Sequence, residues 1–467
     1  MDTKKLRQKI LDLAIRGKLV PQDPNDEPAS VLLERIRAEK ERLIKEGKIK
    51  KSKTSKTADT PHYENVPFEV PKGWCWCKLK DIMEFINGRA YKKEELLSSG
   101  KYKVLRVGNF FTNNSWYYSN LELTEDKYCY KGDLLYAWSA SFGPKIWDGD
   151  KTIFHYHIWN VKYNHSVAIR DYLFYFLLYD KNQISKSTTG STMVHVSMEN
   201  MKPRFIPLPP LKEQQRIVAE IEHWFTLINQ IEQGKAELQT SIKQAKSKIL
   251  DLAIHGKLVP QDPTDEPASE LLKRINPKAE ITCDNGQYGK LPEKWVWTTV
   301  KDISKSILYG VSESAKSEGK YKLLRITDIQ NNQVDWKTVP FTDFDDNKVS
   351  SYILHDGDIV FARTGATVGK SYLIKGLSQK AIYASYLIRV RTFDLILPEY
   401  VKLFFESGYY WEQIELSSVG IGQPNVNGTI LGNLNIPLPP LAEQHRIVAK
   451  IEELFTSLDN IQKALEV

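Results

Sequence analysis

The chain has 467 residues, of which 41% are hydrophobic and 26% charged, and its formal net charge is +7. A chain of this length is too long to fold around a single hydrophobic core, so we expect several domains. The modest net charge favours a nucleic-acid partner only weakly. The longest strongly apolar run, YLFYFLLY, is too short to cross a bilayer, and the N-terminus lacks the apolar core of a signal peptide. We therefore expect a cytoplasmic protein with no membrane partner.

The chain opens on a passage that recurs later. Residues 9–36 and 248–275 are identical at 24 of 28 positions. Both copies have helical apolar spacing that stops at GKLVPQDP, where Gly and Pro are typical of a helix end. The Lys- and Ser-rich run at 45–57 predicts an exposed linker or, alternatively, a strap that contacts phosphates. We assign 1–61 to an N-terminal helical segment with a basic linker.

A first variable region follows at 62–205. Alternating Trp74 and Trp76 predict a half-buried strand, and β-rich segments then precede the helical pattern of IRDYLFYFLLYDKNQI. This order predicts an α+β domain. Cys75 and Cys77 could suggest metal or redox chemistry, but a tetrahedral metal site needs more clustered ligands. We expect buried thiols in a reducing compartment and no metal site.

A second repeated passage comes next. Residues 206–231 and 436–461 share 17 of 26 positions, and each predicts a proline-terminated strand followed by a helix. In the central region, 206–287, the helix is predicted from Leu211 to Ile254, roughly 65 Å at 1.5 Å per residue. Its apolar residues recur at spacings of four and three, interrupted at the position of a lysine, which predicts a coiled-coil seam. The seam residues are Ile217, Ile221, Trp224, Ile228, Ile231, Leu238, Ile242, Ala245, Ile249 and Leu252.

The second variable region, 288–435, repeats the skeleton of the first. GKYKLLRITDI corresponds to GKYKVLRVGNF, and GDIVFARTGATVGK corresponds to GDLLYAWSASFGPK, so we expect a second α+β domain. Within it, GATVGKS (Gly365 to Ser371) resembles a P-loop, but three residues rather than four separate its glycines. No other catalytic or cofactor-binding signature is complete. We predict a chain that is not an enzyme and binds no cofactor.

The C-terminal segment, 436–467, contains only the first part of the repeated helix. By alignment Val467 corresponds to Glu237 and Met1 corresponds to Thr240, so the two termini together complete one more copy of the central element. Because the chain must leave one variable region and return to it, the paired helices must run antiparallel. We predict an α+β protein with two variable domains joined by a long antiparallel two-helix coiled coil, an internal circular repeat with approximate two-fold symmetry.

Polar residues occupy comparable loops of both variable domains. Arg, Lys, Asn and Gln present donors that suit base edges in DNA, and Lys and Ser bind phosphates; each is otherwise an ordinary solvated loop residue. In the first domain the candidates are Arg89, Lys92, Lys93, Asn113, Asn114, Lys186 and His195. In the second domain they are Lys316, Asn331, Asn332, Arg363, Lys370, Gln423, Asn425 and Asn427.

The whole pattern resembles the specificity subunit of type I restriction-modification systems. The resemblance rests on IPLPPLxEQxRIVAxIE, KILDLAIxGKLVPQDPxDEPAS and the return of IPLPPLxEQ after a second variable domain. It implies two target-recognition domains, each binding one half of a split, asymmetric site in double-stranded DNA, with the helices setting the spacing. It also implies two S-adenosylmethionine-dependent adenine methyltransferase subunits and two ATP-dependent restriction subunits as partners.

Two alternatives stay open beside this resemblance. The chain could serve a methylation-only complex that has no restriction subunit. It could also be a coiled-coil scaffold for proteins alone, which would explain the apolar seams but not the two large domains between them.

Overall fold

The computed structural model describes residues 2–47, 66–139, 141–187, 196–281, 290–330, 332–363, 368–417 and 426–466. It divides into two compact units, Met1–Gly234 and Lys235–Val467. Helix α7 (Leu211–Ile254) begins in unit 1 and ends in unit 2, with the bounds that the sequence predicts. No described helix is long and apolar enough to cross a membrane.

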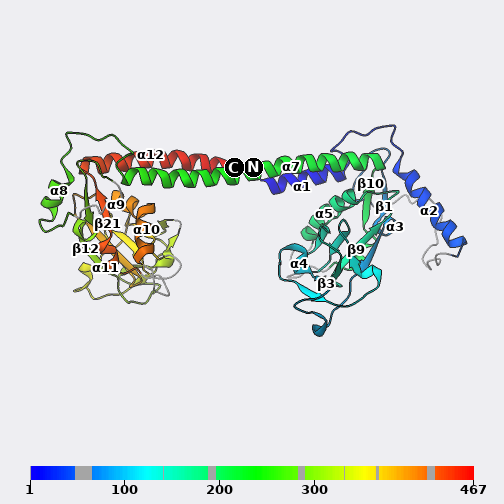
Figure 1. Ribbon diagram of the computed structural model, residues 1–467, viewed down its shortest axis with the longest axis horizontal. Helices are drawn as coiled ribbons and strands as arrows, with labels where there is room; N and C mark the ends of the chain where they lie inside the picture. Colours follow the sequence, from blue (N-terminus) through cyan, green and yellow to red (C-terminus); the bar gives the residue numbers. More distant parts are fainter. Residues whose placement is uncertain are drawn as a thin grey trace. The chain divides into compact units, whose positions relative to one another are not determined.

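Unit 1 is built of short strands and a few helices (Figure 1). Its further helices are α1 (Thr3–Ile15), α2 (Ala29–Lys45), α3 (Leu79–Ile82), α4 (Val107–Phe111), α5 (Arg170–Ser187) and α6 (Met198–Met201). Its strands are β1 (Cys75–Lys78), β2 (Met83–Asn87), β3 (Tyr102–Leu105), β4 (Tyr117–Ser119), β5 (Tyr128–Cys129), β6 (Leu134–Ala137), β7 (Gly143–Ile146), β8 (Thr152–Phe154), β9 (Ile158–Tyr163) and β10 (Phe205–Leu208). They form three sheets, in the orders β1-β10, β2-β9-β6-β7 and β4-β3-β8-β5.

Unit 2 has the same kind of architecture. Its helices are α8 (Ala268–Ile275), α9 (Pro398–Phe404), α10 (Gly408–Ser417), α11 (Gly428–Asn433) and α12 (Leu441–Glu466). Its strands are β11 (Val296–Thr299), β12 (Ser304–Tyr309), β13 (Tyr321–Leu324), β14 (Ile329–Gln330), β15 (Gln333–Val334), β16 (Phe341–Thr342), β17 (Ile359–Ala362), β18 (Ser371–Leu373), β19 (Ala381–Tyr383), β20 (Leu387–Thr392) and β21 (Asn435–Leu438). The sheets are β11-β21, β12-β20-β17-β18, β16-β13-β19 and β14-β15.

The two units share sheet topology and register. In the two-stranded sheets Trp76 lies opposite Pro207, and Trp297 lies opposite Pro437. The sheets β2-β9-β6-β7 and β12-β20-β17-β18 have the same antiparallel order. A parallel strand pair also recurs: β3 pairs with β8 in unit 1, and β13 pairs with β19 in unit 2. The units differ in the helical part that follows β9 or β20: unit 1 has the single helix α5, whereas unit 2 has two helices, α9 and α10. The Ser407 hydroxyl caps the second of them by accepting from the Tyr410 N–H at 3.3 Å.

The repeated passages fold against the start of the helix that follows each variable domain. In unit 1 the Gln22 amide donates to Glu213 at 3.1 Å, and Arg216 pairs with the buried carboxylate of Asp26 at 2.6 Å. Unit 2 repeats both contacts, from Gln261 to Glu443 at 2.6 Å and from Arg446 to Asp265 at 2.6 Å. The repeated passage at 9–36 and 248–275 therefore forms the same contacts with the start of a helix in each unit.

The glycine of GKLVP has the same structural reason in each copy. Gly17 and Gly256 follow α1 and α7 with φ of +66° and +64°, a conformation that side chains disfavour. An added Cβ would also lie 2.3 Å from the Cγ of Pro71 in unit 1, and equally close to that of Pro292 in unit 2. Only glycine allows both the reversal and the close packing.

The helix pairing predicted from the seams is antiparallel within each unit. In unit 1, Arg7 near the start of α1 bonds Glu232 at 2.9 Å, whereas Gln22 beyond its end bonds Glu213. In unit 2, α12 runs against the second half of α7, with Lys246 and Asp459 2.5 Å apart. Figure 1 shows α1 and α12 each alongside α7.

The predicted seam is buried only in part. Ile217, Ile221 and Ile228 are at most 1% exposed, and Ile242 is 4% exposed. In contrast, the middle of α7 exposes Trp224 by 40%, Ile231 by 38% and Leu238 by 40%. These three seam residues are exposed because an apolar period fixes the phase of a helix face but not how far the partner helix covers it.

The cysteines and the P-loop-like segment are the two sequence features that could suggest metal, redox or phosphate chemistry. Cys77 is buried, burial raises the pKa of the half-buried Cys75 thiol to about 11, and the described residues contain no cluster of His, Cys, Asp or Glu able to hold a metal. Residues 364–367 of the P-loop-like segment lie outside the described residues. Lys370 leads directly into strand β18, whereas a P-loop leads into a helix.

Candidate nucleic-acid interface

One end of the sheet β2-β9-β6-β7 in unit 1 carries an aromatic turn, which we call turn site 1: Trp138, Tyr156 and His157. Trp138 directly follows β6, and the other two residues precede β9. The Trp138 N–H donates to the His157 carbonyl at 3.0 Å, and its indole N–H donates to the Tyr156 carbonyl at 2.8 Å. These bonds order the turn and leave the Tyr156 ring 38% exposed.

Unit 2 carries a different set of side chains on the same backbone frame. We call it turn site 2: Tyr309, Arg363 and Tyr386. The Arg363 N–H donates to the Tyr386 carbonyl at 3.1 Å, as Trp138 does to His157 in unit 1. The Arg363 guanidinium lies 5.0 Å from the centre of the Tyr309 ring, and its buried Nε has no partner among the described residues. Tyr386 is 63% exposed.

A further backbone contact fixes the equivalence of the two turn sites. The N–H of Val196 donates to the Trp138 carbonyl at 3.1 Å, and the N–H of Val426 donates to the Arg363 carbonyl at 3.3 Å. Exposed aromatic rings stack on bases, and Arg donates to base edges or phosphates. Each unit therefore presents groups suited to DNA at the same place, but with different chemistry.

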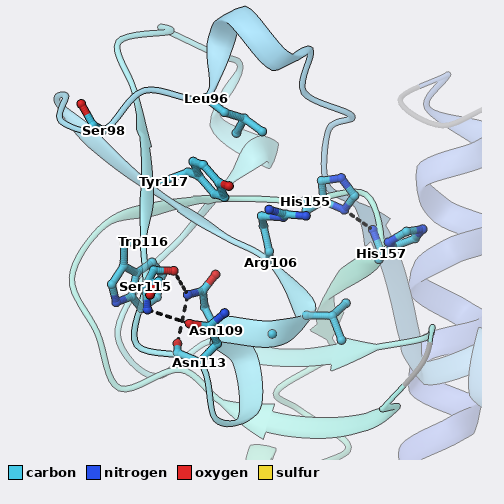
Figure 2. A pocket seen from close by; sticks show the side chains of 12 residues that line it. Leu96, Ser98, Arg106, Asn109, Asn113, Ser115, Trp116, Tyr117, His155 and His157 are labelled. Atoms are coloured by element: carbon cyan, nitrogen blue, oxygen red, sulfur yellow. Dashed lines mark hydrogen bonds between the residues drawn. The ribbon is translucent and has the colours of Figure 1, made fainter. Parts of the chain in front are cut away.

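A cavity of about 770 Å³ in unit 1 adjoins turn site 1 (Figure 2). Its polar and aromatic lining comes from α4, β4, the loop between them and the turn before β9. The main lining residues are Arg106, Asn109, Asn113, Trp116, Tyr117, His155 and His157. We call this cavity the Arg106 pocket.

Internal bonds hold the floor of the Arg106 pocket. The Asn109 amide donates to the carbonyls of Asn113 and Ser115 at 3.0 and 2.7 Å, and the Ser115 N–H donates to the Asn113 side-chain oxygen at 2.7 Å (Figure 2). Burial, with help from His157 and Arg106, lowers the pKa of His155 to about 4. His155 is therefore neutral near pH 7, with one nitrogen donor and one acceptor.

The residues predicted from the loops of unit 1 have mixed outcomes. Arg89 forms two bonds of 2.8 Å with Glu95, a pairing that lowers the pKa of Glu95 to about 2, so its guanidinium is already engaged. Lys92, Lys93 and Asn114 are exposed, and Asn113 lines the Arg106 pocket. The side chain of Lys186 and all of His195 lie outside the described residues.

In unit 2 the predicted residues do not all lie together. Arg363 belongs to turn site 2, and Asn427 lies beside it, where its side chain caps α11 by accepting from the Ile430 N–H at 2.8 Å. Lys316 pairs with Asp343 at 3.1 Å, and Lys370 is exposed. Asn332 instead lines a separate cavity beside α9 and α12, where it donates to Glu406 at 3.3 Å. Asn331, Gln423 and Asn425 lie outside the described residues.

Sequence reasoning missed residues that the fold brings to these sites. The available signal was the alignment of the two domains: GDLLYAW against GDIVFAR places Trp138 opposite Arg363. Likewise GKYKVLRVGN against GKYKLLRITD places Arg106 opposite Arg325. The missed residues are Arg106, Trp138, Tyr156, His157, Tyr309 and Tyr386.

Comparison with known proteins identifies the family. The model of the type I restriction modification DNA specificity domain matches residues 71–240 and 292–467. The chain belongs to this family. Each match begins within a predicted variable domain and extends into the helix that follows, so both matches include the repeated passage at 206–231 or 436–461, whereas the passage at 9–36 and 248–275 lies outside them.

Full-length relatives agree with this assignment. The chain is 30% identical to the Type I restriction enzyme EcoAI specificity subunit of Escherichia coli, an alignment that covers 98% of this chain and 90% of that protein. It is also 30% identical to the EcoEI specificity subunit of Escherichia coli, over 99% of this chain and 91% of that one. A solved chain from a study of complex assembly and conformational transition of the type I R-M system is similar in fold, with a TM-score of 0.58, 18% identity and coverage of 86% and 94%.

Proposed function

We propose that this specificity subunit recognises a bipartite, asymmetric site in double-stranded DNA, one half through each unit. Turn site 1 binds one half-site and turn site 2 binds the other, while the paired helices set the spacing between the halves. The observation that carries the proposal is the equivalence of the two turn sites: the same backbone bonds present Trp138 and His157 in unit 1, but Arg363 and Tyr386 in unit 2. One docking frame with two sets of side chains suits two different sequences.

The chemistry on the bound DNA belongs to partners in this proposal. Two S-adenosylmethionine-dependent methyltransferase subunits methylate adenine, and two ATP-dependent restriction subunits cleave the DNA. The family assignment supports this division, because the similar proteins are named as specificity subunits of restriction enzymes. A methylation-only complex differs solely in lacking the restriction subunits.

The two-stranded sheets suggest a test that uses only this chain. Because β1 pairs with β10 in the same register as β11 with β21, residues 75–205 can be replaced by residues 296–435. The chain would then carry two copies of the second domain. Together with the methyltransferase, it should methylate a site made of two inverted copies of half-site 2.

Sequencing of methylated adenines in cells that express this duplicated chain gives the result. The matched control keeps its own first domain between the same two junctions, and it should methylate the original site. Methylation of the original asymmetric site by the duplicated chain would contradict one domain per half-site. A protein scaffold that does not contact DNA would produce no site-dependent methylation with either chain.

A further inference from the structure

The Arg106 pocket contains an arginine whose charge is not neutralised within the protein. Arg106 is exposed and makes no ion pair with any described residue. Its guanidinium carbon lies 5.2 Å from the centre of the Tyr117 ring, within the range of a cation–π contact that helps to position the group. A guanidinium held in this way keeps its paired N–H donors available to a ligand.

The equivalent arginine of unit 2 is in the opposite state. Arg325 bonds the Asp328 carboxylate through Nε at 3.0 Å and through a terminal nitrogen at 2.7 Å. This pairing neutralises the charge of Arg325 and uses two of its five N–H donors, those on one side of the guanidinium. Asp328 corresponds to Asn109 in unit 1, so a single amide in place of a carboxylate separates the two states.

Strand register adds a second difference. In unit 1, β3 pairs with β4 so that Val104 lies opposite Tyr117. The equivalent residue of β13, Leu323, donates its N–H to the carbonyl of Pro340 at 2.8 Å. Unit 2 thus has a proline where unit 1 has the ring that supports Arg106. Two independent substitutions therefore distinguish the arginine of unit 1.

We propose that Arg106 is a specificity-determining residue that donates two hydrogen bonds to the O6 and N7 atoms of a guanine in the half-site bound by unit 1. The proposal rests on the proposed function of DNA recognition. Two adjacent acceptors on DNA belong either to guanine or to a phosphate group, and both suit a guanidinium. The planar amides, imidazoles and Trp116 that line the Arg106 pocket favour a base. Arg325, paired with Asp328, contributes no such contact in unit 2.

The test measures methyl transfer by the purified complex of this chain with its methyltransferase. The substrates are duplexes that carry each of the four bases at every position of the two half-sites. Arg106→Ala should abolish the preference for one guanine in half-site 1, a loss of roughly ten- to a hundred-fold discrimination. Half-site 2 should be unchanged. Arg325→Ala, the matched variant, should leave the preferences at both half-sites unchanged.

Asn109→Asp tests the physical reason directly. The new carboxylate should pair with Arg106 as Asp328 pairs with Arg325, and it should therefore reproduce the loss seen with Arg106→Ala. Asn109→Ala removes the same bonds to the 113–115 loop but adds no charge. Because Asn109 lines the pocket, this variant should lower methyl transfer on all duplexes alike, and the ratio of transfer on guanine to transfer on the other bases should be retained. Equal loss of the guanine preference in both Asn109 variants would show that loop geometry, not neutralisation, controls recognition, and would overturn the proposal.

Other outcomes separate this proposal from the wider function. If Arg106→Ala weakens transfer equally on all sequences and reduces the salt dependence of binding by one phosphate contact, Arg106 binds phosphate and the guanine assignment is wrong. If the unaltered complex prefers a bipartite site, but Arg106→Ala changes the preference for no guanine in that site, only this proposal fails. If the unaltered complex shows no sequence preference, the proposed function itself fails. Thermal unfolding of each variant confirms that it is folded.

Discussion

Gln214 connects the first recognition domain to the start of α7, and its replacement should loosen that connection. The side chain is fully buried. Its oxygen accepts from the Ile169 N–H at 3.0 Å, and its amide donates to the carbonyls of Val167 and Pro209 at 2.8 and 3.0 Å. Gln214→Leu conserves most of the volume but leaves one backbone N–H and two carbonyls without this partner.

The size of the effect follows from those three groups. A buried polar group left without a partner costs about 1 to 3 kcal/mol, so the loss of three such bonds should lower the free energy of unfolding of unit 1 by about 3 to 9 kcal/mol. Gln444 is the matched residue of unit 2, where it accepts from Leu397 at 2.9 Å and donates to Pro439 at 3.0 Å. With two side-chain bonds instead of three, Gln444→Leu should cost about two thirds as much, about 2 to 6 kcal/mol in unit 2.

Denaturant unfolding of the full chain, followed by hydrogen exchange of individual amides, measures both effects. The Ile169 N–H should lose most of its protection in Gln214→Leu, and the Leu397 N–H should lose its protection only in Gln444→Leu. A loss below about 1 kcal/mol with normal protection of Ile169 would refute the reasoning, because it would mean that the three groups find other partners at no cost.

Three further predictions concern the whole chain. The purified chain without partners should neither methylate nor cut DNA, and methyl transfer by it in a radiolabel assay would contradict a non-catalytic role. Joining Val467 to Met1 by a short linker and opening the chain near Lys53, outside the described residues, should preserve target choice; loss of folding at every linker length would count against adjacent termini. Deleting Ile231–Glu237 together with Ile461–Val467 should shorten the spacing between the two half-sites by roughly 10 Å, about three base pairs. The alternative outcome is weaker binding, because three base pairs also rotate one half-site around the DNA axis. An active variant whose methylated sites keep the original spacing would show that the helices do not set the spacing.

The elements that could be predicted from sequence are those with local signals. The bounds of α7 follow from its apolar period and from the proline and glycine at its ends, and these features involve neighbours in the chain. The antiparallel pairing follows from connectivity alone. By contrast, the exposure of Trp224 depends on how far α1 covers α7, which no local pattern contains.

The candidate site was harder to predict because its chemistry depends on partners distant in sequence. Arg89 and Arg106 look equivalent in the sequence, because both are loop arginines. In the structure, Arg89 forms an ion pair with Glu95, whereas the register of β3 with β4 places the Tyr117 ring beside Arg106. Trp138 and Arg363 occupy one position in the alignment of the two domains, but their different chemistry becomes a surface difference only once the fold leaves both partly exposed at the end of a sheet. Comparison of the two domains position by position, rather than a search for polar loops, would have found both pairs.

The central claim is that each unit recognises its own half of one DNA site. Sequencing of methylated adenines in cells that carry this chain with its methyltransferase tests the claim most directly. Recognition of one half-site by each unit predicts one asymmetric motif, made of two specified blocks separated by a gap of fixed length in which any base is accepted. A single continuous motif, or methylation with no sequence preference, would contradict it.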